Sequence, residues 1–462
     1  MKNYNWDLEY LLGNDSLENL FKKWKKSLDN LSKDNNYFCD TKENFVKRLK
    51  DELKHHKISN HLVNYISNHL NEDSKNEKWI EWSQKISSET NEFMKKTSDT
   101  SNIVLKNEKK IREYLNDPLL HEYVRDYNIF FKNKNRILSK DQEKLIANLS
   151  VINDGFENIY SAIVDSTIKY EPAKDKKGKL TKITSMAKAM KLFKSKDEIL
   201  RKNAWINFSK SYYDNRFALT QTLIYNYKML NANSKIRKFS SYVEMTAEND
   251  EVTVDFIQKI YLGVEDFKNH YKKFIEIREK LIKSNNNLKK VMPWDRYLDI
   301  VKSKEKYTIE STKKEILEAL KCFGEEYLEI VQKAFNENWI SWLPKDGKHS
   351  GAYSIGGTYG IEKYYISMNF DDTINSLYTA IHEIGHSMNS YYFGKKQKVH
   401  CSCSIFYAEI SSITNELILS FHLLEKAKSK KEKLFVSDKI LAGFVSITSR
   451  QITFSDFENE II

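Results

Sequence analysis

The stretch His382-Glu383-Ile384-Gly385-His386 decides the expected fold and site of this 462-residue chain. Two histidines stand four residues apart and a glutamate follows the first, which is the H-E-x-x-H pattern by which a helix binds zinc. On a helix, positions four apart share one face, so both imidazoles reach the same metal ion. Glu383 lies beside that line, where its carboxylate can take a proton from a water molecule on the metal.

The residues before the motif predict the helix that it needs. Asp371, Asp372 and Thr373 are candidate N-cap residues. An apolar stripe at helical spacing follows them, made of Ile374, Leu377, Ala380, Ile381, Ile384 and Met388. The alternative is a structural helix that merely contains two hydrogen-bonded histidines.

A catalytic zinc ion usually takes three ligands from the protein and leaves one position for water. The longer pattern H-E-x-x-H-x-x-G-x-x-H does not supply the third, because the positions in question hold Asn389 and Tyr392. The downstream candidates are His400, Glu409 and Glu416. Spacing alone favours Glu409 only modestly over His400.

Glu409 is expected to begin a second amphipathic helix. Glu416 lies seven residues further on, so the two carboxylates share one face two turns apart. One of them can bind the metal while the other holds a ligand histidine by a hydrogen bond. For Glu416 the alternative is an ordinary exposed carboxylate.

Composition predicts a mainly α protein. The chain holds only 4 prolines and 13 glycines, and long patterns of period 3.6 dominate it. The first such helix should start at a capping box formed by Asp15 and Glu18. Its apolar stripe consists of Leu17, Leu20, Phe21, Trp24, Leu28 and Leu31.

Two segments interrupt the helical pattern. Residues 171–182 contain proline, glycine and a lysine run, and predict an exposed turn or hairpin at a lobe boundary. Residues 364–370 (YYISMNF) predict a short strand directly before the metal-binding helix. Such an edge can pair with a substrate backbone; the alternative is a small structural hairpin.

Charge and cysteine content exclude several classes of function. The net charge is +11, but lysines alternate with acidic residues and no nucleic-acid motif occurs, which favours a solvated surface and no nucleic-acid partner. Cys401 and Cys403 form a lone C-x-C, which we interpret as neutral thiols rather than a soft-metal site. Without an apolar run of membrane length, we expect no membrane span and a cytoplasmic location.

In its motifs the chain resembles the oligoendopeptidase F branch of the thimet-oligopeptidase-like zinc peptidases. Residues 347–354 (GKHSGAYS), 382–387 (HEIGHS) and 408–416 (AEISSITNE) carry the resemblance, which covers almost the whole chain. It implies a mainly α fold, namely a large two-lobed helical body with a deep channel and a small β-region next to the zinc site. We expect an N-terminal helical lobe at residues 1–190 and a zinc peptidase domain at residues 191–462.

The resemblance also implies roles for the candidate residues. Glu409 becomes the third ligand of one zinc ion beside His382 and His386, and Glu416 becomes a supporting residue. The implied activity is hydrolysis of internal bonds in short oligopeptides, with Glu383 as general base. No substrate-binding residue is assigned by the pattern.

One departure from the family bears on the expected activity. Family members continue well beyond the point that matches residues 450–458, and that further segment normally brings a histidine and tyrosines toward the zinc. We therefore expect the zinc peptidase domain to be C-terminally incomplete, with a separate chain as a candidate source of the segment. The alternatives are a catalytically impaired, truncated peptide-binding protein and a related helical zinc carboxypeptidase.

Overall fold

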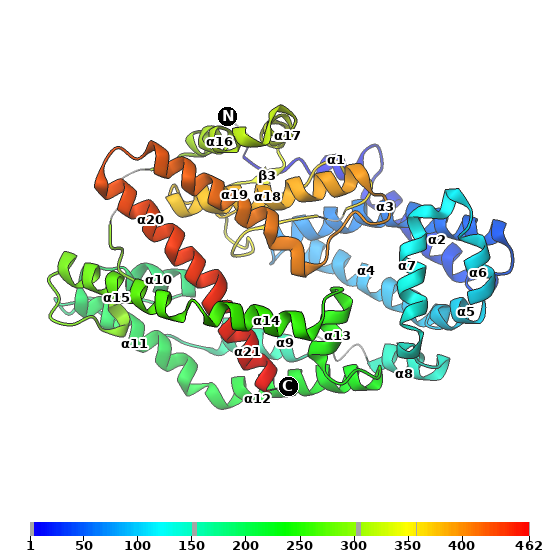
Figure 1. Cartoon of the computed structure of the whole chain (residues 1–462), viewed down its shortest axis with the longest axis horizontal. Helices are drawn as coiled ribbons and strands as arrows, with labels where there is room; N and C mark the ends of the chain where they lie inside the picture. The colour runs from blue at the N-terminus through cyan, green and yellow to red at the C-terminus, as the bar shows by residue number, and fades with distance from the viewer. Residues whose placement is uncertain (1–3, 150–154, 302–305, 357, 462) are drawn as a thin grey trace. The chain divides into compact units, whose positions relative to one another are not determined.

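A computed structural model describes residues 4–149, 155–301, 306–356 and 358–461. The fold is mainly α, as predicted (Figure 1). It divides into two compact units, each built from segments that are not consecutive in the sequence. Unit 1 comprises Met1–Asn148 and Glu305–His422, and unit 2 comprises Leu149–Lys304 and Leu423–Ile462. The division of the sequence at residue 190 and the deep channel stay predictions.

The α-helices of unit 1 come from both of its sequence segments. They are α1 (Glu9–Leu12), α2 (Leu17–Asp34), α3 (Lys42–Glu72), α4 (Glu77–Lys96), α5 (Thr100–Lys106), α6 (Glu108–Tyr114), α7 (His121–Lys132), α8 (Lys140–Leu149), α16 (Ile309–Ala319), α17 (Glu325–Asn336), α18 (Ile374–Lys396) and α19 (Ile405–Lys426). The last residues of α8 and α19 extend past the limits of this unit.

The helices of the second unit are shorter on average than those of the first. They are α9 (Gly155–Ser161), α10 (Met186–Phe193), α11 (Glu198–Asp214), α12 (Arg216–Ile236), α13 (Tyr242–Asn249), α14 (Val254–Glu265), α15 (Lys268–Asn285), α20 (Lys430–Val445) and α21 (Gln451–Ile461). The predicted hairpin also lies here, with β1 (Ala173–Lys174) antiparallel to β2 (Leu180–Thr181).

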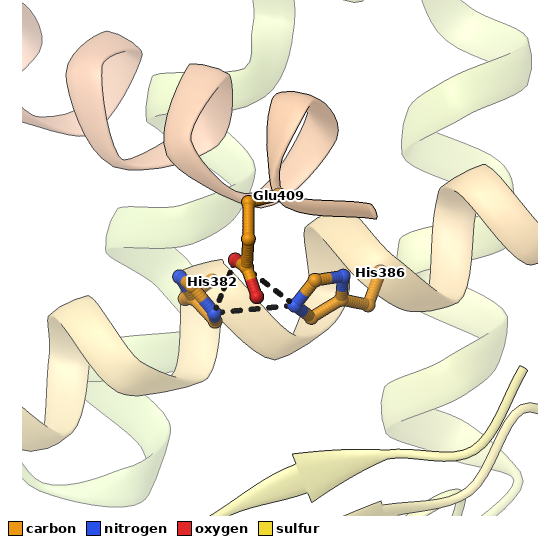
Figure 2. A group of neighbouring side chains, drawn as sticks. All are labelled: His382, His386 and Glu409. Atoms are coloured by element: carbon orange, nitrogen blue, oxygen red, sulfur yellow. Dashed lines mark hydrogen bonds and ion pairs between the residues drawn. The ribbon is translucent and has the colours of Figure 1, made fainter. Parts of the chain in front are cut away.

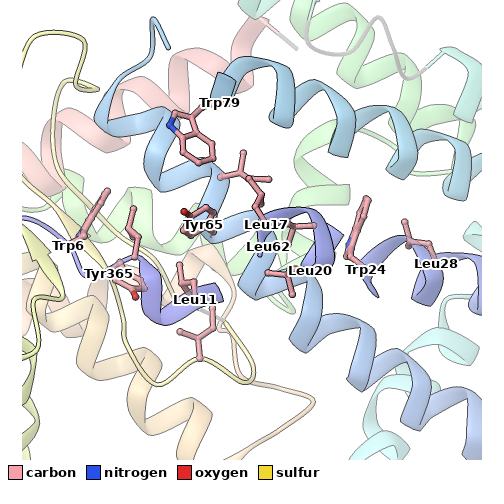
Figure 3. Packing of buried hydrophobic residues seen from close by; sticks show 13 residues of the cluster. Trp6, Leu11, Leu17, Leu20, Trp24, Leu28, Leu62, Tyr65, Trp79 and Tyr365 are labelled. Carbon is pink, nitrogen blue, oxygen red and sulfur yellow. The ribbon is translucent and has the colours of Figure 1, made fainter. Parts of the chain in front are cut away.

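One hydrophobic core of unit 1 forms around α2 and α3 (Figure 3). Helix α2 has the predicted apolar stripe, but Ser16 caps it by accepting from Asn19 N, so the predicted capping box starting at Asp15 was wrong. A serine hydroxyl one residue nearer the helix has the shorter reach to that amide. The indole of Trp6 belongs to the same core and donates to the carbonyl of Ile366 at 2.7 Å.

A three-stranded sheet of order β3-β5-β4 lies beside α18. In it β3 (Ile340–Ser341) is parallel to β5 (Ile366–Ser367), which is antiparallel to β4 (Tyr353–Ser354). The predicted strand at 364–370 is thus present, but its regular part is only β5. The Ser354 hydroxyl lies 2.8 Å from the Ser387 hydroxyl of α18, so the sheet is joined directly to that helix.

The described helices include none that is both long and apolar enough to cross a membrane. All four cysteines are free thiols.

Candidate metal centre

Helix α18 presents the H-E-x-x-H residues from its middle. Of the three N-cap candidates, Thr373 caps the helix by accepting from Ser376 N at 3.4 Å. The apolar stripe is buried, with Leu377 and Ile381 fully inaccessible. The helix therefore keeps one face in the core and leaves both histidine side chains partly exposed on another.

Helix α19 brings the third candidate to α18. It begins at Ile405, so the prediction that it starts at Glu409 was wrong by one turn, because the helix is extended by residues whose side chains are exposed. The two helices touch at Gly385, where an added Cβ would lie 2.6 Å from Ser412 Cα. Only glycine allows this approach. Gly385 was not identified from the sequence, although a glycine inside a helix indicates a packing reason.

The side chains of His382, His386 and Glu409 converge in front of α18 (Figure 2). We call these three residues the donor cluster. The His382 Nε2 atom lies 3.2 Å from His386 Nε2 and 3.3 Å from Glu409 Oε2, and the remaining pair is 3.5 Å apart. Three donor atoms at nearly equal separations surround a single point, where one metal ion can bind.

Two hydrogen bonds orient the donor cluster. Glu416 Oε1 accepts from His382 Nδ1 at 2.6 Å, which leaves Nε2 of the same ring to face the cluster. The Ser412 hydroxyl donates to Glu409 Oε2 at 2.7 Å and fixes the oxygen that faces the histidines. Ser412 was not identified from the sequence, although its place one turn after Glu409 on the same helix face is a usable signal.

The other sequence candidates lie outside the donor cluster. His400 is in the connection between α18 and α19, where Nε2 lies 3.1 Å from the carbonyl of Glu122 and Nδ1 lies 3.6 Å from Asp126. Cys401 is buried, and Cys403 accepts a hydrogen bond from Asn389 at 3.5 Å. None of these side chains belongs to a metal-binding group among the described residues.

The charges around the cluster set the protonation of its histidines. Burial alone lowers the pKa of His382, but the hydrogen bond to Glu416 and the nearby carboxylates raise it above the ordinary value. Burial also lowers the pKa of His386, with a further decrease from the neighbouring His382 and an opposing effect of Glu409. A neutral His386 is the form that binds a metal.

Glu383 lies within the core side of the site. Its exposed fraction is 6%, and burial, with the charges of Glu409 and Glu416, raises the pKa of its carboxyl group to about 7. A carboxyl group that titrates near neutral pH is suited both to accept and to return a proton.

Sequence comparisons place the chain among peptidases. The pattern of peptidase family M3 matches residues 191–461, and that of oligopeptidase F matches residues 103–170. An oligoendopeptidase F homolog of Mycoplasma genitalium is 34% identical over 466 residues, covering 100% of this chain and 77% of the relative. The oligopeptidase PepF of Bacillus subtilis is 28% identical, covering 99% of this chain and 68% of the relative.

Solved structures show the same fold. A putative peptidase from Chlamydophila abortus has a TM-score of 0.76 at 24% identity, covering 99% of this chain and 77% of that one. Oligoendopeptidase-F from Enterococcus faecium has a TM-score of 0.68 at 22% identity, covering 96% and 75%. Fold and sequence together define a helical metallopeptidase. More particularly, the chain belongs to peptidase family M3, in its oligoendopeptidase F branch.

Proposed function

We propose that this chain is a zinc-dependent endopeptidase that hydrolyses internal bonds of short oligopeptides. The observation that carries this proposal is the donor cluster, whose three atoms lie within 4.8 Å of one another directly beside the buried Glu383. The names of its relatives support oligopeptides as the substrate class. Four free thiols support a reducing, cytoplasmic compartment.

The donor set fits zinc. Zinc binds imidazole nitrogen and carboxylate oxygen at about 2.0–2.2 Å in tetrahedral geometry, which places any two donors about 3.3 Å apart. The separations of 3.2, 3.3 and 3.5 Å in the donor cluster match that value. Two histidines and one glutamate are also a known donor set of catalytic zinc, with the fourth position left for water.

Each residue of the site has a role in this mechanism. A zinc ion held by the donor cluster would supply a Lewis acid for the scissile carbonyl and the attacking water. Glu383 accepts the proton of that water and later donates it to the leaving amine. Glu416 fixes the tautomer of His382, and Ser412 fixes the carboxylate of Glu409.

The decisive experiment is Glu383→Gln, assayed with internally quenched peptides and by metal analysis. Loss of the general base should lower the rate by about 10²–10⁴-fold while one zinc ion per chain is retained. The matched control is Glu318→Gln on α16, which should keep the parent rate. Cleavage by Glu383→Gln at the parent rate would contradict the mechanism.

Product analysis by mass spectrometry tests the type of cleavage. Internal cuts are expected in peptides that are blocked at both ends. Release of terminal residues alone would instead favour the carboxypeptidase alternative. Peptide binding without cleavage by the zinc-loaded chain would favour the peptide-binding alternative.

A further inference from the structure

A cavity of about 300 Å³ opens beside Glu383 in unit 1. One face of α18 forms most of its wall, because Tyr378, Thr379, His382 and Glu383 stand at spacings that share that face. Ala352, directly before β4, and Glu416 of α19 complete the described lining. The cavity therefore adjoins both the general base and the donor cluster.

The position of this cavity relates it to the scissile bond. If Glu383 and the donor cluster act on one carbonyl group, that carbonyl lies directly at the mouth of the cavity. Adjacent Cα atoms of a peptide are only about 3.8 Å apart, so the side chains flanking the bond emerge within reach of its walls. In an extended peptide successive side chains point to opposite faces, so only one of the two flanking side chains can enter.

The lining selects by charge. Among the described residues that line the cavity, none is lysine or arginine, and two are glutamates. Glu416 adds a carboxylate that is not one of the three donor atoms, so the lining holds an acidic group beyond the metal ligands. An acidic side chain in the cavity would meet net repulsion, whereas a basic one would be attracted.

The hydroxyl groups add hydrogen-bonding capacity. Tyr378 belongs to the lining, and its hydroxyl lies 2.8 Å from the hydroxyl of Ser420. Thr379 stands on the same turn, outside the donor cluster, and its side chain is partly exposed. A charge can therefore be added at Thr379 without removing a metal ligand or the general base.

We propose that this cavity is a substrate subsite that receives the side chain of one residue directly flanking the scissile bond and prefers a basic side chain to an acidic one. The inference rests on the proposed peptidase function, since it places the scissile bond by Glu383. It assigns Tyr378, Thr379 and Ala352 to substrate selection.

The test compares peptides that carry Lys or Glu at either flanking position. For the zinc-loaded parent, kcat/KM should favour Lys by about tenfold or more at one of the two positions, as expected for a charge contact in a partly buried site. Thr379→Lys should remove or reverse that preference. Thr379→Val, which has nearly the same shape but no charge, should retain it, and both variants should bind one zinc ion.

A second readout does not depend on turnover. Fluorescence polarisation should show that metal-stripped parent protein binds the uncleaved Lys peptide more tightly than the Glu peptide, and that Thr379→Lys removes the difference. A parent that cleaves peptides without charge preference, or a preference that Thr379→Lys leaves intact, would overturn the subsite. If the parent cleaves no peptide but still binds the Lys peptide more tightly, the proposed peptidase function is wrong and the proposed subsite stands.

Discussion

Two groups of histidine and carboxylate side chains in unit 1 have metal-binding composition among the described residues, and they differ in geometry. The donor cluster has three nearly equal separations. In the second group, which we call the α16 cluster, Glu315 and Glu318 of α16 face His422 of α19. There His422 Nε2 lies 2.9 Å from Glu315 but 4.0 Å from Glu318.

The difference teaches that composition alone does not define a metal site. In the α16 cluster one histidine makes a close hydrogen-bonded pair, and the other carboxylate stays at a distance typical of a loose ion pair. In the donor cluster the two imidazole nitrogens are 3.2 Å apart and lie 3.3 and 3.5 Å from the Glu409 carboxylate, an arrangement suited to a shared cation. We therefore expect one zinc ion per chain.

The largest expected effect comes from removing a donor. His386→Ala should weaken zinc binding by at least about 10³-fold, because even the loss of a supporting residue typically costs 10–100-fold. His422→Ala in the α16 cluster is the control and should retain one zinc ion per chain, measured by elemental analysis after dialysis. If the parent bound two zinc ions and His422→Ala bound only one, the α16 cluster would also be a zinc site and the comparison would fail.

The second effect concerns the buried carboxyl group that adjoins the donor cluster. The pKa of Glu383 is about 7 in the folded protein and 4.5 ordinarily. Because the folded value is raised, its stabilising contribution is complete below pH 4.5 and is lost as the pH rises through 7. Between pH 4.5 and pH 8, the free energy of unfolding of the metal-free parent should thus fall by about 3 kcal/mol relative to that of Glu383→Gln.

Chemical denaturation of both metal-free proteins at those two pH values measures this difference. Parallel changes of stability in the two proteins would show that Glu383 does not titrate in this range.

The third effect concerns the contact between helices that assembles the donor cluster. Gly385→Ala places a methyl group against the backbone of α19, which cannot rotate away, and should lower the free energy of unfolding by about 1–3 kcal/mol. Zinc affinity should fall with it. Gly443→Ala in α20 is the matched control, because a Cβ there meets nothing within 4 Å.

The free energy of unfolding of Gly443→Ala should rise by up to about 1 kcal/mol, because alanine has the higher helix propensity. Unchanged stability and zinc affinity in Gly385→Ala would show that the two helices can separate without disturbing the site.

The smallest effect separates the supporting carboxylates of the two clusters. Glu416→Gln weakens the hydrogen bond that orients His382 and should lower zinc affinity by about 10–100-fold. Glu315→Gln makes the same chemical change beside His422 and should leave zinc affinity unchanged. Competition with a zinc chelator measures the zinc affinity of both variants. Equal losses of affinity would show that the carboxylates of the two clusters support zinc binding equally.

Sequence patterns predicted those parts of the site that are local. The H-E-x-x-H helix, its apolar stripe and the nearby strand follow from periodicity, and the proline, glycine and lysines of residues 171–182 predict an exposed turn or hairpin. The helix ends at Ser16 and Ile405 differ from the predicted ones, because several neighbouring residues compete to cap or extend a helix. Such choices depend on small local energies.

The rest required tertiary contacts. The approach of Ser412 to Gly385 and the bond of Ser412 to Glu409 depend on how α18 and α19 cross, which no periodicity encodes. The α16 cluster joins side chains 107 residues apart, so it could not be seen in the sequence. The cavity beside Glu383 likewise exists only after three separate segments have met.

The hydrogen bond from Trp6 to Ile366 has a consequence for biosynthesis, since its partners are 360 residues apart. At a translation rate of about 5–20 residues per second, the tryptophan waits roughly 20–70 s on the ribosome for its acceptor. During that interval the apolar surface of α2 and α3 lacks its later cover. We therefore expect nascent chains to depend on chaperones more than the finished protein does.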